Sequence, residues 1–422
     1  MIIFSRLTTL LSLLATSSMA LAGGPLILEG KSGNTPVSYQ NPNITIHAES
    51  GDLGTINNDA ADTIMREAFA LWNNVNTATI NLSLDDIVIN EDINISNFEN
   101  FIPNVSGSIF NADDGKNPIV YDNNGEIIDA FFGAGASLGT IGFAASVFNL
   151  KGDFFIEGYA VINGRQLNPP LTPTERKLLV THEIGHLIGL DHSQADISNQ
   201  EQTSNFTICA TESQDRYPVM YPFVCRNEET LHADDVSAIS SLYPAGIFDN
   251  SFGSIEGRFV DENNNAILGA NIWAENTSTG EVVSIVSDYL DQGNGFYQLH
   301  LTPGNYTLHA NSINRLFNDG SSIGPHATSL TDKSFTDPSF INPDPITEVV
   351  LLAEDNSDEI ITVLANNTQL INLASTGKSV TLSSENESGS GGSGTFSGIL
   401  SLLLFSLLLI YRQYYYVEKF NR

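Results

Sequence analysis

The sequence predicts an α+β domain, with a mixed sheet and one helix that carries a candidate site, then an all-β sandwich and one C-terminal transmembrane helix. Three observations lead to this prediction. Helical and strand-like stretches alternate between residues 44 and 246, and short alternating stretches without a helical period occupy 250–370. A run of about 17 mostly apolar residues covers 395–411. With 422 residues the chain is long enough for two or three domains.

The first domain is predicted to begin with a strand at 45–50 and a helix from Asp59 to Trp72, which has apolar residues on one face. Four strand-like stretches separated by turn residues follow at 78–84, 117–122, 126–132 and 158–164. A second helix is expected to begin at the capping box Thr172-Pro173-Thr174-Glu175 and to end at Gly189. Seven short strands are expected in the sandwich, at 254–261, 266–276, 281–287, 295–301, 304–310, 346–353 and 359–365.

Charge and the N-terminal residues indicate an exported protein. The chain has 17 basic and 49 acidic residues, and its net charge of −32 would repel nucleic acids, so no nucleic acid partner is expected. Residues 1–22 have the pattern of a cleaved secretory signal peptide, for which a transmembrane anchor is the alternative. A short N-terminal segment, 23–43, would then precede the first domain.

Export changes how the two cysteines are interpreted. In an oxidising compartment, Cys209 and Cys225 are expected to form a disulfide that closes a loop of about 15 residues and stabilises the fold by roughly 3 kcal/mol. Two free buried thiols are the alternative.

The C-terminal region is expected to hold a Gly/Ser-rich linker at 371–394, a transmembrane helix or sorting signal at 395–411 and a cytoplasmic tail at 412–422. Three basic residues follow the apolar run and place the tail in the cytoplasm. The region resembles the GlyGly-CTERM type of bacterial sorting signal, although its tail is longer and less basic, so processing stays open. A GPI signal is the other alternative, but such signals usually end in their apolar run.

The stretch VTHEIGHLIGLDHS, residues 180–193, holds the candidate site. His182 and His186 are four residues apart, so both imidazoles lie on one helix face and can meet one ion. Glu183 lies one step round the helix, within reach of a metal-bound water, and a chain reversal at Gly189 returns His192 as a third ligand. Three neutral imidazoles leave tetrahedral Zn²⁺ one open position, as in catalytic zinc sites, and Glu183 would act as the general base. The alternative is a helix with incidental surface histidines.

These residues resemble the metzincin zinc endopeptidases, whose motif HExxHxxGxxH is matched from His182 to His192, with Ser193 following as in the matrixin branch. PVMYP (218–222) is similar to the matrixin Met-turn, which implies that Met220 forms the apolar floor under the metal. The same resemblance implies that Tyr221 and Pro222 lead to the wall of the substrate pocket.

LHADDVSAISSLYP (231–244) is similar to the closing helix of matrixin domains, which implies that Asp234 and Asp235 brace the Met-turn and the start of the chain. The second module resembles the carboxypeptidase regulatory-like β-sandwich, from GSIEGRFVDENNNAILGANIWAEN through GFYQLHLTPGNYTLHA. Such modules are usually spacers or binding platforms.

The chain also departs from vertebrate matrixins. No histidine lies between His47 and His182, so the additional structural zinc site of those enzymes is not expected. No cysteine precedes the site, which excludes a cysteine switch, and 23–43 is too short for a folded prodomain. Calcium is a candidate brace at 111–117 and 122–129, where ordinary Asx turns are the alternative.

The resulting expectation is an exported zinc metalloendopeptidase that acts as a monomer on protein or peptide substrates. It would be anchored to the membrane through the C-terminal helix unless the tail is processed. The alternative is a surface adhesin or binding protein with a degenerate protease domain. Glu183 argues against that alternative, because a site that only binds zinc needs the histidines and not the base. A calcium-stiffened envelope protein would explain the acidity but not the histidines.

Overall fold

The computed structural model describes residues 24–28, 35–85, 89–102, 114–149, 153–167, 171–193, 195, 209, 211–261, 264–311, 346–351 and 360–380. The expected signal peptide, transmembrane helix and cytoplasmic tail lie outside these residues. Within them, no helix combines the length and the apolar character needed to cross a bilayer.

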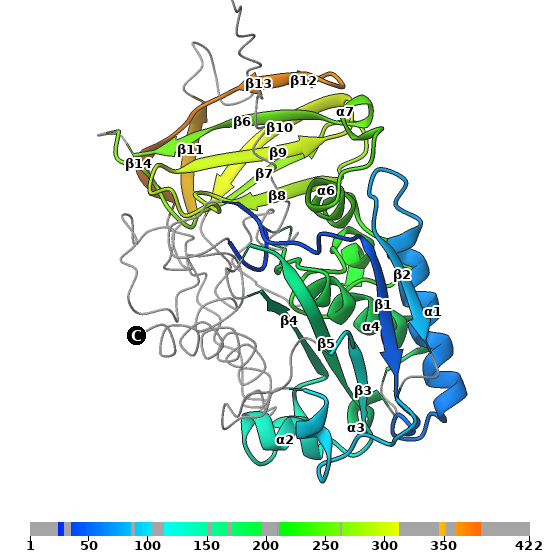
Figure 1. The fold of residues 1–422 in the computed structure, drawn as a ribbon. Helices are drawn as coiled ribbons and strands as arrows, with labels where there is room; N and C mark the ends of the chain where they lie inside the picture. The colour runs from blue at the N-terminus through cyan, green and yellow to red at the C-terminus, as the bar shows by residue number, and fades with distance from the viewer. Residues whose placement is uncertain are drawn as a thin grey trace, which may run out of the picture.

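The first domain is built on a mixed five-stranded sheet of order β2-β1-β3-β5-β4, in which only β4 runs antiparallel to its neighbour (Figure 1). Its strands are β1 Asn43–Ala48, β2 Asn81–Asp85, β3 Pro118–Asp122, β4 Gly142–Phe148 and β5 Phe155–Asn163. The residues of β4, GFAASVF, do not alternate between apolar and polar side chains, which is why no expected stretch covered this strand.

Two long helices cover one face of this sheet. They are α1, Asn58–Asn73, and α4, Pro173–Leu187. The indole N–H of Trp72 donates to the Thr181 carbonyl at 3.0 Å and joins the two helices through the core. Among the described residues of this region, the other helices are α2 Glu126–Phe132, α3 Gly164–Leu167, α6 Ala233–Leu242 and α7 Phe248–Ser251, with 3₁₀ turns η1 Phe98–Asn100, η2 Ala136–Leu138 and η3 Thr211–Arg216.

The stretch 126–132, expected as a strand, is the helix α2, so that prediction was wrong. Its four buried side chains follow a helical spacing, and they pack on the other face of the sheet: Ile127, Ile128, Phe131 and Phe132. Gly125, at φ 82°, reverses the chain just before the helix, and the Asp122 carboxylate accepts the Ile128 N–H at 2.9 Å. In a short apolar run, this pattern is hard to distinguish from a buried strand.

The second module has two facing β-sheets. One has the order β12-β10-β7-β8, and the other has the order β11-β14-β6-β13, with β9 also paired to β6. Its strands are β6 Gly253–Val260, β7 Asn271–Asn276, β8 Val282–Val286, β9 Phe296–Leu301, β10 Gly304–Asn311, β11 Ile346–Leu351, β12 Ile361–Val363, β13 Thr368–Leu370 and β14 Leu373–Val380.

β14 corrects the expected boundary of this module. It lies inside the stretch predicted to be a linker, 371–394, and it pairs with β6 and β11. Backbone pairing uses N–H and C=O groups that every residue except proline supplies, so a Gly/Ser-containing sequence can still complete a sheet.

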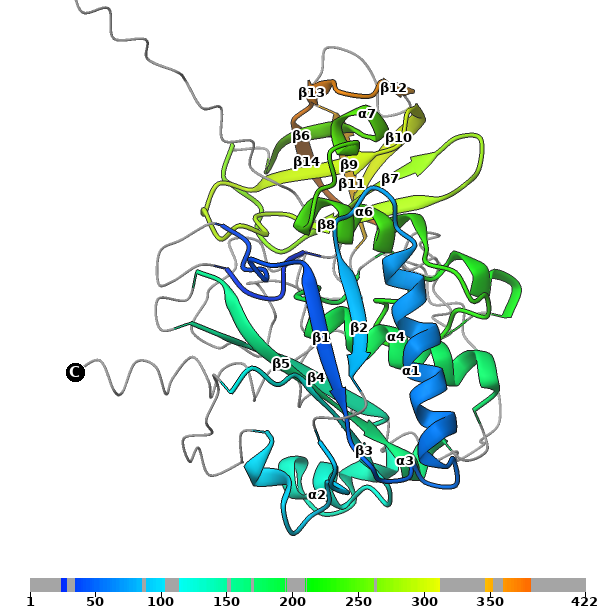
Figure 2. The ribbon, with the colours of Figure 1, turned by 45° about the vertical axis from the view of Figure 1, so that its right-hand side comes forward.

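The sandwich rests against the first domain at α6, and both views show β8 beside this helix (Figures 1 and 2). One continuous apolar core includes residues of α1, α4 and α6 and of the sandwich strands. The two regions are therefore packed together, and α6, which closes the first domain, lies at their junction.

Candidate metal centre

The register of α4 is set at its first turn. The Thr172 hydroxyl accepts the Glu175 N–H at 3.2 Å, and the Glu175 carboxylate accepts the Thr172 N–H at 2.6 Å. Both bonds of the capping box are therefore present, and Pro173 occupies the first helical position. This start places His182 and His186 one turn apart in the buried last two thirds of the helix.

Gly189 turns the chain back toward α4. Its φ is +100°, and a Cβ there would lie 2.7 Å from the Phe155 ring. The reversal brings His192 to the two helical histidines. The Nε2 atom of His186 lies 3.1 Å from the Nε2 atoms of both His182 and His192.

Hydrogen bonds at the far side of two rings orient their Nε2 atoms. The Nδ1 atom of His182 lies 2.7 Å from the Val219 carbonyl, and that of His186 lies 2.8 Å from the Leu190 carbonyl. A carbonyl can only accept, so each Nδ1 carries the proton and each Nε2 presents a lone pair.

This donor set fits a metal ion. Two nitrogens bound to one tetrahedral ion at about 2.1 Å would lie about 3.4 Å apart, close to the observed separations. Within the described part of the chain, these three histidines form the one group of three His, Cys, Asp or Glu residues whose ligand atoms converge.

Burial also sets the protonation of the helical ligands. Desolvation lowers the pKa of His182 to about 4 and that of His186 to about 3. Both imidazoles are therefore neutral at pH 7, which is the form that binds a metal.

Glu183 directly follows His182 on α4, and its carboxylate lies against the first residue of β4. A Cβ on Gly142 would lie 2.8 Å from Glu183 Oε1 and 3.0 Å from its Cδ, so only glycine leaves this space free. Burial raises the pKa of Glu183 to about 8. A cation held by the histidines would favour the ionised carboxylate.

Met220 lies directly beneath the histidine helix. A Cβ on Gly185 would overlap the Met220 sulfur, so glycine allows the methionine to approach α4. The backbone N–H groups of Val219 and Met220 donate to the two carboxylate oxygens of Asp235, at 2.8 and 2.9 Å. The resemblance had implied this brace of the turn by Asp235.

The two residues expected to lead to the substrate pocket lie just after Met220. Tyr221 is buried, and its ring packs on Tyr217 with centroids 4.8 Å apart. Pro222 is half-buried. Tyr221 is thus part of the packing behind the turn.

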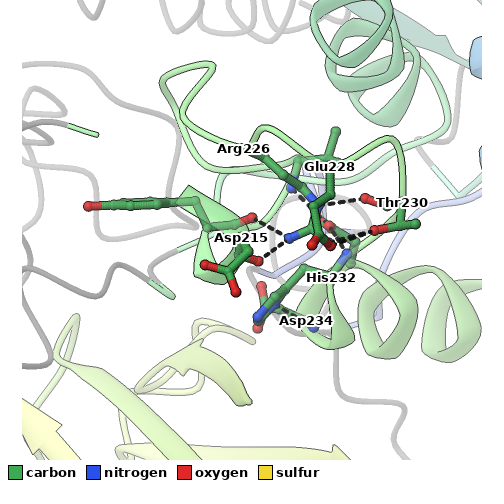
Figure 3. A network of polar contacts seen from close by, with 9 residues as sticks. Asp215, Arg226, Glu228, Thr230, His232 and Asp234 are labelled. Carbon is green, nitrogen blue, oxygen red and sulfur yellow. Dashed lines mark hydrogen bonds and ion pairs between the residues drawn. The ribbon is translucent and has the colours of Figure 1, made fainter. Parts of the chain in front are cut away.

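A disulfide and an arginine hold the segment that carries this turn. Cys209 and Cys225 are disulfide-bonded, with Cα atoms 4.7 Å apart. The next residue, Arg226, is 5% exposed, and Figure 3 shows its guanidinium at the centre of a polar network. It donates to the carbonyls of Asp215, Tyr217 and Thr230, to the Thr230 hydroxyl and to the Glu228 carboxylate. No motif in the sequence pointed to this arginine.

Within the described residues, the hydrogen bonds of the Asp234 carboxylate go to the Ser193 loop and to the sandwich, and most of the chain start that it was expected to brace lies outside these residues. The carboxylate accepts the Ser193 hydroxyl at 2.5 Å and the Ser284 N–H, on β8, at 2.6 Å. Residues 24–28, the first that the structure describes, lie along the loop between the second and third histidines. The Leu26 N–H donates to the Gly189 carbonyl at 2.9 Å.

The oxygens considered for calcium hold the chain's own amides. Asp122 accepts the Ile128 N–H, as described above, and Asp129 accepts the Ser137 N–H at 2.7 Å. Asp114 accepts the Lys116 N–H and Asn117 accepts that of Gly158. These are contacts of side-chain oxygens with the backbone, and residues 111–113 lie outside the described part of the chain. We therefore propose no calcium site.

No family model matches the chain, and no curated protein sequence matches it. Among solved structures, the chain is similar to the Bacillus anthracis TIE protein, with 16% identity and a TM-score of 0.17 over 30% of this chain. It is also similar to BcpA, the major pilin subunit of Bacillus cereus, with 17% identity and a TM-score of 0.16 over 30% of this chain. The chain spans 16% and 30% of the length of these two structures. Likenesses at these scores carry no argument about fold or function.

Proposed function

We propose that this protein is an exported zinc endopeptidase that hydrolyses peptide bonds in protein or peptide substrates. The single observation that carries the proposal is the convergence of three imidazoles, with a buried glutamate at the helix position that follows the first of them. His182, His186 and His192 would hold the ion, and Glu183 would be the catalytic base.

Zinc at this position would lower the pKa of a bound water toward ~7 and polarise the substrate carbonyl. Glu183 would take the proton from the attacking water and pass it to the departing amine. Its carboxylate lies in the space beside Gly142, at the start of the edge strand β4, which a larger residue would fill. Met220 and the Asp235 brace would keep the helical histidines in place from below.

The proposed cellular location rests on the sequence. A signal peptide at 1–22 would export the chain, and the helix at 395–411 would anchor it with the catalytic domain outside the cytoplasm. The protein would act as a monomer, because one chain supplies all three imidazoles and the base.

A purified full-length chain in detergent tests the proposal directly. It should contain one zinc ion per chain and cut a denatured peptide library, with new termini identified by mass spectrometry. A strong chelator should stop cleavage, and added zinc should restore it. One bound zinc without cleavage of any peptide would favour a binding protein over a peptidase. A chain that retains no zinc would contradict both a zinc peptidase and a zinc-binding protein.

A further inference from the structure

Asp234 is a buried carboxylate at the junction of the two regions. It lies in the first turn of α6 and is 1% exposed. One carboxylate oxygen accepts the hydroxyl of Ser193, and the other accepts the backbone N–H of Ser284. A single side chain therefore joins the first domain to the β-sandwich.

At its Ser193 end, the link made by Asp234 lies next to the third histidine. Ser193 directly follows His192, and its hydroxyl also accepts the Ala195 N–H at 2.9 Å. Its own N–H donates to the Met220 carbonyl at 2.9 Å. The residue next to the ligand is thus held both by the methionine turn and by Asp234.

At its other end, the link made by Asp234 reaches the edge strand β8. β8 is the last strand of the order β12-β10-β7-β8, and Ser284 lies opposite Trp273 of β7. The Ser284 N–H donates to Asp234, outside the β7–β8 ladder. A backbone N–H of the sandwich therefore holds a carboxylate of the first domain. A module that served only as a spacer would not need this hydrogen bond.

Two other hydrogen bonds hold the same two surfaces together away from the histidine loop. The Ser237 hydroxyl donates to the His300 carbonyl at 2.8 Å, and Arg216 donates to the Gly280 carbonyl at 3.3 Å. On the histidine loop itself, Ala195 packs in a small apolar cluster with Trp273 and Val282 of the sandwich. These contacts keep β8 at a fixed place beside α6.

We infer that the β-sandwich is a structural part of the metal centre, in which the Ser284 amide holds Asp234 and Asp234 holds the loop of His192. Asp234 and Ser284 are positioning residues. The inference rests on the proposed zinc site, and it assigns the sandwich a role in metal affinity.

Zinc affinity of full-length variants, measured by competition with a chromophoric chelator, tests this link. Ser284→Pro removes the N–H and costs no ladder hydrogen bond, because this amide faces away from β7. Ser193→Ala breaks the other end. Each should weaken zinc binding by about 10-fold, as losses of outer hydrogen-bond partners do. The double variant should lose less than the product of the two, because both changes break one chain of contacts. The visible spectrum of the cobalt-substituted protein should change in both single variants.

Ser237→Ala is the matched control, because it removes a hydrogen bond across the same junction that does not lead to His192. Its zinc affinity should stay within about twofold of the parent. If Ser284→Pro binds zinc like the parent and shows the parent's cobalt spectrum while Ser193→Ala does not, the sandwich is a spacer and the inference is wrong. A parent chain that binds no zinc would instead overturn the proposed function.

Hydrogen exchange of the unmodified chain gives a second test that does not depend on the folding of any variant. Coupling between two sites is reciprocal, so zinc should slow exchange of the peptide that covers β8. The peptide that covers β12, at the far edge of the same sheet, should be unaffected. Equal exchange of β8 with and without zinc would contradict the inference.

Discussion

Glu183 depends on a residue that has no side chain. Gly142 leaves open the space that the Glu183 carboxylate occupies, and a methyl group there would meet Oε1 at 2.8 Å. The two residues lie on different elements, β4 and α4, so the sequence motif contains only one of them. The histidines and the glutamate could be predicted because their geometry is local to one helix and one turn, whereas the glycine could not.

Gly142→Ala should therefore displace the Glu183 carboxylate and leave the imidazoles in place. We expect kcat to fall by about 10- to 100-fold, the effect of a misplacement of about 1 Å, with zinc content unchanged. Gly246→Ala is the control, because a Cβ there meets nothing within 4 Å. Steady-state kinetics together with metal analysis check the prediction. Parent-like kcat in Gly142→Ala would show that this contact does not position the base.

His232 gives a prediction about pH. It caps α6 through its Nδ1 atom, which accepts the Asp234 N–H at 3.2 Å, and burial followed by the nearby Arg226 and Arg216 lowers its pKa to about 3. Between about pH 3 and 6.5 the unfolded chain binds a proton here that the folded chain does not. This residue therefore makes the free energy of unfolding rise with pH across that window, by up to about 1.4 kcal/mol per pH unit.

His232→Asn keeps a side-chain oxygen for the cap and removes the titrating group. The slope of the free energy of unfolding against pH, measured with urea between about pH 4 and 6.5, should fall by up to about 1.4 kcal/mol per unit. Other titrating groups are common to both proteins and cancel in the comparison. Parallel slopes would mean that His232 is protonated in the folded protein.

At the scale of elements, α4 and α2 show what sequence patterns can resolve. The capping box, the proline and the terminal glycine all favour the same bounds for α4, and the structure has the helix at Pro173–Leu187. The seven residues of α2 have no such box, and their apolar run fits a strand as well as a short helix. The length of the apolar run and a capping residue distinguish a helix from a strand in such cases. The helix α2 is short and has no capping side chain at its N-cap.

The segment between η3 and α6 is an element without regular structure, and Arg226 organises it (Figure 3). Arg226→Lys keeps the charge but cannot reach carbonyls on both sides of the segment, because an ammonium lacks the planar fork. We expect the free energy of unfolding to fall by about 2 to 4 kcal/mol, since buried acceptors lose their donors. Lys177→Arg, at a more exposed cation, should change it by less than about 0.5 kcal/mol. Urea unfolding of both variants checks this, and equal small losses would contradict it.

At the scale of the whole molecule, the contact between Asp234 and Ser284 was beyond sequence reasoning. The two residues are 50 positions apart and belong to regions that each resemble independent modules. The resemblance suggested that Asp234 braces the start of the chain, but the packed sandwich supplies a competing N–H donor. Where two modules meet, the partner of a buried carboxylate depends on their docking, and no local pattern encodes that.

The predicted topology has a consequence for intact cells. A cleaved signal followed by one C-terminal helix with basic residues behind it should leave the catalytic domain outside the cytoplasm. Protease added to intact cells should release this domain or its fragments, while a cytoplasmic marker protein stays intact. Full protection of the domain, with its recovery in the cytoplasmic fraction, would contradict the topology.

Zinc content and peptidase activity, measured together on Glu183→Gln, test the proposed chemistry most directly. The substitution keeps the size of the side chain and leaves all three imidazoles untouched, so one zinc per chain and parent-like stability are expected. Hydrolysis should fall by about 10²- to 10⁴-fold, because the general base is lost. His192→Ala should instead lose metal and activity together. A zinc-loaded Glu183→Gln protein that kept most of its peptidase activity would contradict the mechanism, even with the metal site correct.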